Sequence, residues 1–368
     1  MGVARSSARP SAFTAGVLVL ALVGGCTSEG SGQPDAAASR TPTASTQPPT
    51  ASASPPTPQD PTDEPSESPT ASAQRPPHPV SLPALFDKEY DGRRLRLGEV
   101  LIREDAYTQR AVTYRSDGLT ISGVMNIPRT SGDRRRLPAL VLAHGYIDPA
   151  IYVTGQGLRR EQDWLARAGY VVLHVDYRTH AGSDEDPRAE RRLRLGYTVD
   201  VINAVHALRR SGLRAVDPDR VGLLGRSMGG GVAYNVLTVA PGLVDAAVVY
   251  APVSSRTEDN FERWIRGERP DLAAAIIGRY GAPERNRRFW RGVSPRTYFE
   301  RVTEPVLIHH GTADESCPIR WTRATHRAMQ RSGVDARLEV YPGEPHAFEA
   351  AWPRSMDRTV RFFRRHLG

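Results

Sequence analysis

The sequence predicts an α/β fold in which a mostly parallel sheet is flanked by helices. From residue 137 to the C-terminus, short apolar runs of strand length alternate with segments of helix length. Strands that are buried on both faces read as continuous apolar runs, and strand–helix alternation is typical of parallel sheets joined by crossover helices. The segment 252–298 breaks this alternation, and we expect it to form a short helical cap over the carboxyl ends of the strands.

The expected elements begin with a hairpin. Two β-prone runs, 110–116 and 119–127, flank the dipeptide Asp117-Gly118, which favours a tight turn between antiparallel strands. Further strands are predicted at 137–143, 170–175, 220–224, 244–251, 306–310 and 336–341, and helices at 155–168, 190–211, 228–239, 319–333 and 353–366. No internal repeat is visible, which argues against a propeller.

The N-terminus has the pattern of a secretion signal. A positively charged start precedes an apolar run at 12–23, which has the length of a signal-peptide core. The run ends in Val23-Gly24-Gly25-Cys26, which resembles the lipobox of bacterial lipoproteins. This resemblance implies a signal peptide at 1–25 and acylation of Cys26. Two or three acyl chains would anchor the protein stably at the extracytoplasmic face of the cell membrane. An ordinary secretory signal is the alternative.

The segment that follows Cys26 has the composition of a linker. Residues 27–80 are almost entirely Ser, Thr, Pro, Ala, Gln and Gly, with scattered acidic residues. Such a segment cannot bury enough apolar surface to offset its conformational entropy, so we predict a disordered linker. Globular composition begins near Val80. The expected layout is therefore a signal peptide at 1–25, a lipidated cysteine and linker at 26–80, and one folded domain at 81–368.

The chain is basic, with a formal net charge of +8, and Lys88 is its only lysine. A basic surface favours contact with anionic lipid or wall polymer, although an arginine-rich composition is the simpler explanation. No basic helix interleaved with aromatic residues is visible, so a nucleic acid is not an expected partner.

A candidate nucleophile lies at Gly225-Arg226-Ser227-Met228-Gly229, which matches the pattern GxSxG. An apolar strand runs directly into this segment and a glycine-rich helix begins directly after it, which is the context that a nucleophile elbow requires. The glycines leave room for a strained turn that lifts the serine hydroxyl clear of the sheet. A phosphate-binding loop would need a different glycine spacing and a lysine. We therefore predict an α/β-hydrolase fold with Ser227 as nucleophile.

A serine nucleophile needs a histidine base and an orienting carboxylate, which follow it in the order acid, then histidine. Asp314 lies just after the strand predicted at 306–310, and His346 lies just after the strand at 336–341. Both loops are expected at the same edge of the sheet. Glu315 is the neighbouring rival, but the position of Asp314 nearer the strand end favours the first acid.

Other chemistry-bearing residues in this region have simpler explanations. His309 and His310 lie within a predicted strand, where a histidine is usually packed or hydrogen-bonded. Glu344 is too close to His346 in the chain to be its expected partner. Cys317 is best explained as a buried free thiol. No metal site is predicted.

The oxyanion of an acyl-transfer reaction needs two hydrogen-bond donors. The backbone N–H of Met228 follows the nucleophile and is the first candidate. The second is the N–H of Tyr146, in the loop after the strand at 137–143, and its hydroxyl is a further candidate donor. His144 and the segment Asp176-Tyr177-Arg178 are expected to be structural.

Together these motifs resemble the catalytic domain of the prolyl oligopeptidase family and its dienelactone-hydrolase-like neighbours. The resemblance rests on His144-Gly145, Asp176-Tyr177-Arg178, the pentapeptide at 225–229, His310-Gly311 with Asp314 and Pro318, and His346-Ala347-Phe348. It extends from about residue 110 to the C-terminus. The resemblance implies hydrolysis of a peptide or ester bond through an acyl-enzyme, without a cofactor.

The substrate class has two candidates. Peptidases of the family carry a large N-terminal propeller, whereas only a short globular stretch precedes the matching region here. A prolyl-oligopeptidase-like serine peptidase is the first expectation, and a carboxylesterase is the alternative. A non-catalytic lipoprotein that uses the fold to bind a partner is a third. Trp264, Phe289 and Trp290 are expected either to line the substrate pocket or to fill the core of the cap.

Overall fold

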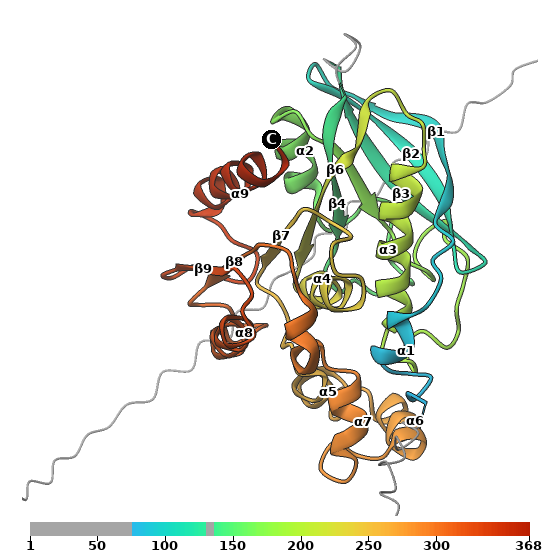
Figure 1. Ribbon diagram of the computed structural model, residues 1–368, viewed down its shortest axis with the longest axis vertical. Helices are drawn as coiled ribbons and strands as arrows, with labels where there is room; N and C mark the ends of the chain where they lie inside the picture. The colour runs from blue at the N-terminus through green and yellow to red at the C-terminus, as the bar shows by residue number, and fades with distance from the viewer. Residues whose placement is uncertain (1–75, 130–135) are drawn as a thin grey trace, which may run out of the picture. The chain divides into compact units, whose positions relative to one another are not determined.

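The computed structural model describes residues 76–129 and 136–368, and these residues form one nine-stranded sheet flanked by helices (Figure 1). The predicted signal peptide, Cys26 and nearly all of the predicted linker lie outside the described residues. The strands are β1 (Arg93–Arg103), β2 (Tyr107–Ser116), β3 (Leu119–Pro128), β4 (Leu137–Ala143), β5 (Val171–Val175), β6 (Val216–Arg226), β7 (Ala246–Tyr250), β8 (Val306–Gly311) and β9 (Ala336–Tyr341). The helices are α1 (Pro83–Phe86), α2 (Arg159–Arg167), α3 (Leu195–Arg209), α4 (Met228–Val239), α5 (Thr257–Trp264), α6 (Pro270–Tyr280), α7 (Arg287–Gly292), the 3-10 segment η2 (Pro295–Arg301), α8 (Ile319–Arg331) and α9 (Trp352–Leu367).

The strand order is β1-β2-β3-β5-β4-β6-β7-β8-β9, and the six strands from β5 to β9 in that order are parallel to their neighbours. The first three strands are antiparallel, and β3 is also antiparallel to β5. The predicted hairpin is confirmed, because Ser116 pairs with Leu119 around Asp117 and Gly118, which have φ angles of 53° and 81°. The fold class predicted from the sequence is therefore correct, and the edge strand β1 is an element that the sequence did not predict.

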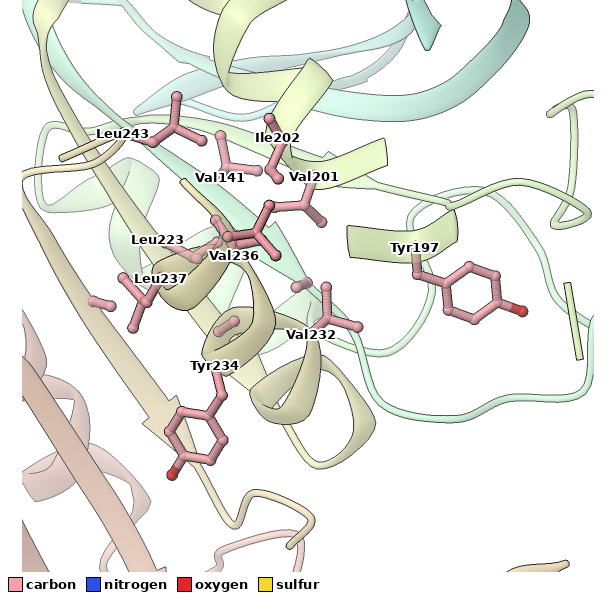
Figure 2. Packing of buried hydrophobic residues seen from close by; sticks show 14 of the residues in the cluster. Val141, Tyr197, Val201, Ile202, Leu223, Val232, Tyr234, Val236, Leu237 and Leu243 are labelled. Atoms are coloured by element: carbon pink, nitrogen blue, oxygen red, sulfur yellow. The ribbon is translucent and has the colours of Figure 1, made fainter. Parts of the chain in front are cut away.

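Helices cover both faces of the sheet. Along β4, Val141 packs into the core beneath α3 and α4, whereas Leu140 and Leu142 pack on the opposite face beneath α2 and α9 (Figure 1). Figure 2 shows the first of these cores, with side chains from two strands and two helices in contact: Val141, Leu223, Val201, Ile202, Val236 and Leu237. Successive side chains of a strand point to opposite faces, so an uninterrupted apolar run is required here.

Helix α3 begins later than the sequence predicts. A helix was expected from residue 190, but α3 starts at Leu195 because Leu193 and Arg194 have φ angles of 52° and 57°. These left-handed conformations cannot continue an α-helix and are uncommon outside glycine. Residues 191–194 therefore form a turn, and their side chains do not continue the surface of α3.

The segment 252–298 is largely helical, as predicted, and consists of α5, α6, α7 and the start of η2. These helices follow β7 and lie together below α4 in the view of Figure 1. The chain preceding α1 packs on them, since the Leu82 N–H donates to the Gly292 carbonyl at 2.9 Å and the His78 ring meets Phe289 edge-on. Within 76–129 and 136–368, no helix has both the length and the apolar character needed to cross a membrane.

Candidate active site

Ser227 occupies a strained turn between β6 and α4. Its φ and ψ angles are 55° and −119°, a conformation that costs a non-glycine residue about 1–3 kcal/mol. The flanking glycines are required by close backbone approaches, because a Cβ at Gly225 would collide with the Gly229 carbonyl and one at Gly229 with that of Ala143. The strand–turn–helix geometry predicted for this segment is therefore present, and Ser227 is the first residue beyond the strand.

His346 and Asp314 form a hydrogen-bonded pair. His346 Nδ1 lies 2.9 Å from Asp314 Oδ2, and the carboxylate is fully buried while the imidazole is about one-fifth exposed. The neighbouring Glu315 does not approach the ring; its Oε2 instead accepts the backbone N–H of His346 at 3.2 Å. The structure thus brings Asp314 to the imidazole, as predicted from the sequence, and gives Glu315 a contact to the loop backbone.

The carboxylate of Asp314 is held ionised by its surroundings. Burial alone would raise the pKa of Asp314, but hydrogen bonds from His310 and His346 and from the Cys317 N–H hold this pKa well below its usual range. The Ser316 and Cys317 N–H groups both donate to Oδ1, at 2.9 and 2.7 Å. Oδ2 is left to the imidazoles, so the carboxylate can fix one ring and balance its charge.

His310 contributes a second imidazole to this carboxylate. Its Nε2 lies 3.2 Å from Asp314 Oδ2 and 2.8 Å from the Cys317 carbonyl. Its Nδ1 lies 2.7 Å from the hydroxyl of Thr322. Two acceptors around Nε2 place the proton on that atom, and Nδ1 then accepts from the threonine. His310 is thus buried and hydrogen-bonded, as expected of a histidine in a strand, but its contact with Asp314 was not predicted, although the residues lie four positions apart.

The oxyanion loop passes directly beside the nucleophile. A Cβ at Gly145 would lie 3.2 Å from the Cβ of Ser227, so the backbone between His144 and Tyr146 borders the serine hydroxyl. The backbone of Met228 begins α4 on the other side. Both predicted donor residues therefore flank Ser227. The Tyr146 side chain is 49% exposed, and its ring lies against the guanidinium of Arg194 at 4.7 Å.

The loop that carries His346 is clamped from two elements. Arg160 of α2 donates to the carbonyls of Ala347 and Phe348 at 2.6 and 3.2 Å. Arg226, the residue before the nucleophile, donates to the same Ala347 carbonyl at 3.3 Å. Arg226 Nη2 lies 3.0 Å from the buried carboxylate of Glu161 in an ion pair, and the same carboxylate accepts a hydrogen bond from the indole of Trp352. Arg226 thus ties the elbow to the histidine loop by a hydrogen bond and to α2 by an ion pair.

The residues expected to be structural have structural contacts. Asp176 accepts from the hydroxyls of Tyr152 and Ser122, and Arg178 makes a buried ion pair with Asp200. His144 is buried, and burial together with the neighbouring histidines lowers its pKa to about 3.

Cys317 is a buried free thiol, as predicted. Burial and the charge of Asp314 raise the pKa of the Cys317 thiol to about 12, although the Ser227 hydroxyl beside it acts in the opposite direction. A thiol held neutral in this way is a poor nucleophile.

A cavity of about 530 Å³ opens over Ser227 and His346. Its walls come from Tyr146, the first turns of α4, and the cap. Trp264 lines this cavity, whereas Phe289 and Trp290 are buried and pack on each other within the cap. In the described part of the chain, no group of three or more His, Cys, Asp or Glu side chains is arranged to hold a metal ion.

Residues 156–368 match the prolyl oligopeptidase family. The chain belongs to that family. It is 26% identical to the acylamino-acid-releasing enzyme of Sus scrofa over 247 residues, which cover 62% of this chain and 31% of the relative. It is 25% identical to the uncharacterized peptidase YuxL of Bacillus subtilis over 289 residues, covering 75% of this chain and 41% of the relative. The chain therefore spans less than half the length of these relatives.

A solved structure supports the fold. The acylaminoacyl peptidase of Pyrococcus horikoshii superimposes with a TM-score of 0.57 at 21% identity, over 72% of this chain and 42% of that one. The family match begins at residue 156, after β4. It contains the elbow, Asp314 and His346, while the oxyanion loop lies before it.

Proposed function

We propose that this protein is a serine hydrolase that cleaves a peptide or ester bond through an acyl-enzyme, with Ser227, His346 and Asp314 as its catalytic residues. The observation that carries the proposal is the coincidence of three features at one site. Ser227 sits in a strained elbow, His346 lines the same cavity, and Asp314 binds the Nδ1 side of that imidazole. These three features support acyl transfer by a serine, a histidine and an aspartate.

In the proposed reaction, Ser227 Oγ attacks the substrate carbonyl while Nε2 of His346 accepts its proton. Asp314 keeps the proton of the ring on Nδ1 and balances the positive charge that the imidazole gains. The backbone N–H groups of Met228 and Tyr146 stabilise the oxyanion. His346 then returns the proton to the leaving group, and a water activated by the same imidazole releases the acyl group.

A peptide substrate is the first candidate. It is supported by family membership and by the similarity to relatives whose names describe peptidases. An ester is the second candidate, and one feature of the structure favours it. The cavity is lined by the domain and its own cap, from Tyr146 to His346, so a small ester would find an acyl pocket within this domain alone.

The test is a paired measurement of labelling and turnover. A fluorophosphonate probe should label the wild type on Ser227 and leave Ser227→Ala unlabelled, and the variant should lose at least about a thousandfold in kcat. Labelling that persists in the variant would show that another serine was modified. A panel of p-nitrophenyl esters beside aminoacyl, acylaminoacyl and dipeptidyl anilides then separates esterase from peptidase by the ratio of kcat/KM values.

We further propose that the protein is anchored to the outer face of the cell membrane through lipid on Cys26. The support is the sequence alone: an apolar signal core, the tetrapeptide that ends in Cys26, and a Ser/Thr/Pro-rich segment that follows. A tether of that composition would let the catalytic domain reach substrates at the cell surface.

A further inference from the structure

Two arginines face each other across one carboxylate in the cavity above Ser227. Arg194, at the start of α3, contacts Glu190 through Nε and Nη2 at 2.9 and 3.0 Å. Arg269, at the start of the cap helix α6, donates from Nη1 to the same carboxylate at 2.9 Å. All three residues line the cavity. The group is therefore a polar wall that joins the core of the domain to its cap.

This wall carries an unbalanced positive charge. One carboxylate serves two guanidinium groups, and the side chains of Glu190, Arg194 and Arg269 are only 26%, 22% and 36% exposed. Each guanidinium has five N–H donors, of which the contacts to Glu190 use a minority. Glu268 also lines the cavity but is exposed, so water and salt screen its charge more strongly. The half-buried part of the wall is left with one net positive charge.

Arg194 is placed close to the reacting atoms by a strained backbone. Leu193 and Arg194 both adopt left-handed conformations, which are costly for side-chain-bearing residues. The guanidinium reaches Met228 Sδ at 3.4 Å and covers the ring of Tyr146 at 4.7 Å. Arg194 therefore touches both residues that flank the proposed oxyanion position. Backbone strain of this kind persists only where the surrounding structure holds it, and here it fixes the direction of the Arg194 side chain.

We propose that Arg194 and Arg269 form a binding site for a carboxylate on the acyl portion of the substrate, so that the enzyme favours acyl groups that carry a negative charge. A carboxylate a few bonds from the scissile carbonyl would reach the wall while the carbonyl lies at Ser227. The remaining N–H donors would bind it through charge-assisted hydrogen bonds. Glu190 is already shared by two arginines, so a substrate ammonium group would gain little there.

The inference rests on the proposed hydrolase function and is tested with two esters of equal chain length. The p-nitrophenyl hemiester of adipic acid carries a terminal carboxylate, and p-nitrophenyl hexanoate ends in a methyl group. The wild type should hydrolyse the adipate hemiester at least as efficiently as the hexanoate, despite the cost of removing a carboxylate from water. The adipate-to-hexanoate ratio of kcat/KM values should fall as the salt concentration is raised.

The cap supplies a matched pair of variants. Arg269→Gln should lower the adipate-to-hexanoate ratio about tenfold, mainly through KM for the adipate hemiester, since it removes hydrogen bonds to a charged group. Arg266→Gln makes the same charge change three residues away, where the guanidinium pairs with Glu262 and Glu284 and does not line the cavity. It should leave the ratio unchanged. Arg194→Gln is the second variant and should lower the ratio as well.

The outcomes separate this inference from the proposed function. Hexanoate hydrolysis with discrimination against the adipate hemiester overturns the carboxylate site and leaves the serine hydrolase intact. An equal fall of the adipate-to-hexanoate ratio in Arg269→Gln and Arg266→Gln overturns the site too. The preference would then come from the overall positive charge of the cap rather than from a bound carboxylate. If neither ester is hydrolysed and Ser227 takes up no fluorophosphonate, the proposed function itself fails and the site falls with it.

Discussion

The Nε2 atom of His310 lies 3.2 Å from Oδ2 of Asp314, the same oxygen that accepts from His346 at 2.9 Å. Two imidazoles thus share one carboxylate oxygen. One ring comes from the loop between β9 and α9, and the other comes from β8, the strand that precedes the carboxylate. The shared oxygen links the orientation of the proposed base to a residue in the core of the sheet.

Replacing His310 should therefore affect catalysis as well as stability. His310→Leu removes a donor from the buried carboxylate of Asp314, and we expect kcat/KM to fall about tenfold because the carboxylate is no longer fixed on both sides. His310→Gln can keep a donor and should lose less. Fluorophosphonate titration counts the folded sites, so a loss per active site distinguishes a positioning role from simple unfolding. Full activity per titrated site in the leucine variant would contradict the positioning role.

The two adjacent acids offer a direct comparison. Asp314→Asn should lower kcat by about ten-thousandfold near neutral pH, because an amide favours the wrong tautomer of His346. Glu315→Gln should cost little, since its contact is to the backbone N–H of His346 and an amide oxygen can still accept it. Steady-state kinetics on one activated ester measure both effects. A crippled Glu315→Gln beside an active Asp314→Asn would transfer the role to the second acid.

Arg226 should be needed for rate more than for substrate binding. Arg226→Gln loosens the loop at Ala347 and leaves Glu161 buried without its charge partner, so we expect a lower kcat, a nearly unchanged KM and a loss of about 3–5 kcal/mol in stability.

The double variant Arg226→Gln/Glu161→Gln separates these two effects. Removing both charges should recover much of the stability, since no unpaired buried charge remains. It should not recover kcat, because the tie between the elbow and the Ala347 carbonyl is still weakened. Thermal melts and kinetics on the same preparations provide the comparison, and recovery of both quantities would assign the pair a purely structural role.

Buried neutral histidines should make the fold sensitive to mild acid. Burial lowers the pKa values of His144, His174 and His309 to about 3. The unfolded chain binds these protons from about pH 6.5 downward, while the folded chain excludes them until about pH 3. Stability is therefore lost as pH falls through this window, by about 2 kcal/mol per histidine at pH 5.

Thermal melts between pH 7 and pH 4 measure this dependence. His309→Gln should flatten the curve by the share of one histidine, since glutamine can still bond to Tyr341 and Thr359 but does not titrate. The carboxylate of Asp314 adds a separate loss of stability at lower pH. Its pKa is lower in the folded than in the unfolded state, so the unfolded chain takes up this proton first as pH falls. An unchanged slope in His309→Gln would show that this histidine does not contribute.

The lipid anchor is tested apart from catalysis. Cys26→Ser removes the thiol that acylation requires, so the protein should leave the detergent-rich phase or accumulate with its signal peptide uncleaved. Detergent phase partitioning followed by immunoblotting measures this. Hydrolysis per folded molecule should be unaffected. Membrane association of a Cys26→Ser protein that has lost its signal peptide, equal to that of the wild type, would rule out lipid on Cys26 as the anchor.

The sequence by itself determined the features that depend on local pattern. Continuous apolar runs predicted the strands of the parallel sheet, because a strand buried on both faces has no polar positions. The elbow at Ser227 was readable because strand, turn and helix are contiguous in the chain. The bounds of β4, α4 and β9 agree with the predicted segments for the same reason.

Only the tertiary structure decided how side chains from distant segments meet. Asp314 and Glu315 are equally acidic neighbours, and backbone direction alone sends the first to the imidazole of His346. Arg160 reaches the carbonyl of Ala347 across 187 positions. Helix α3 begins later than predicted because two residues before it adopt left-handed conformations, which the apolar pattern of a helix does not encode. Such contacts depend on the angles at which packed elements cross, and these angles are set by the whole core rather than by any stretch of sequence.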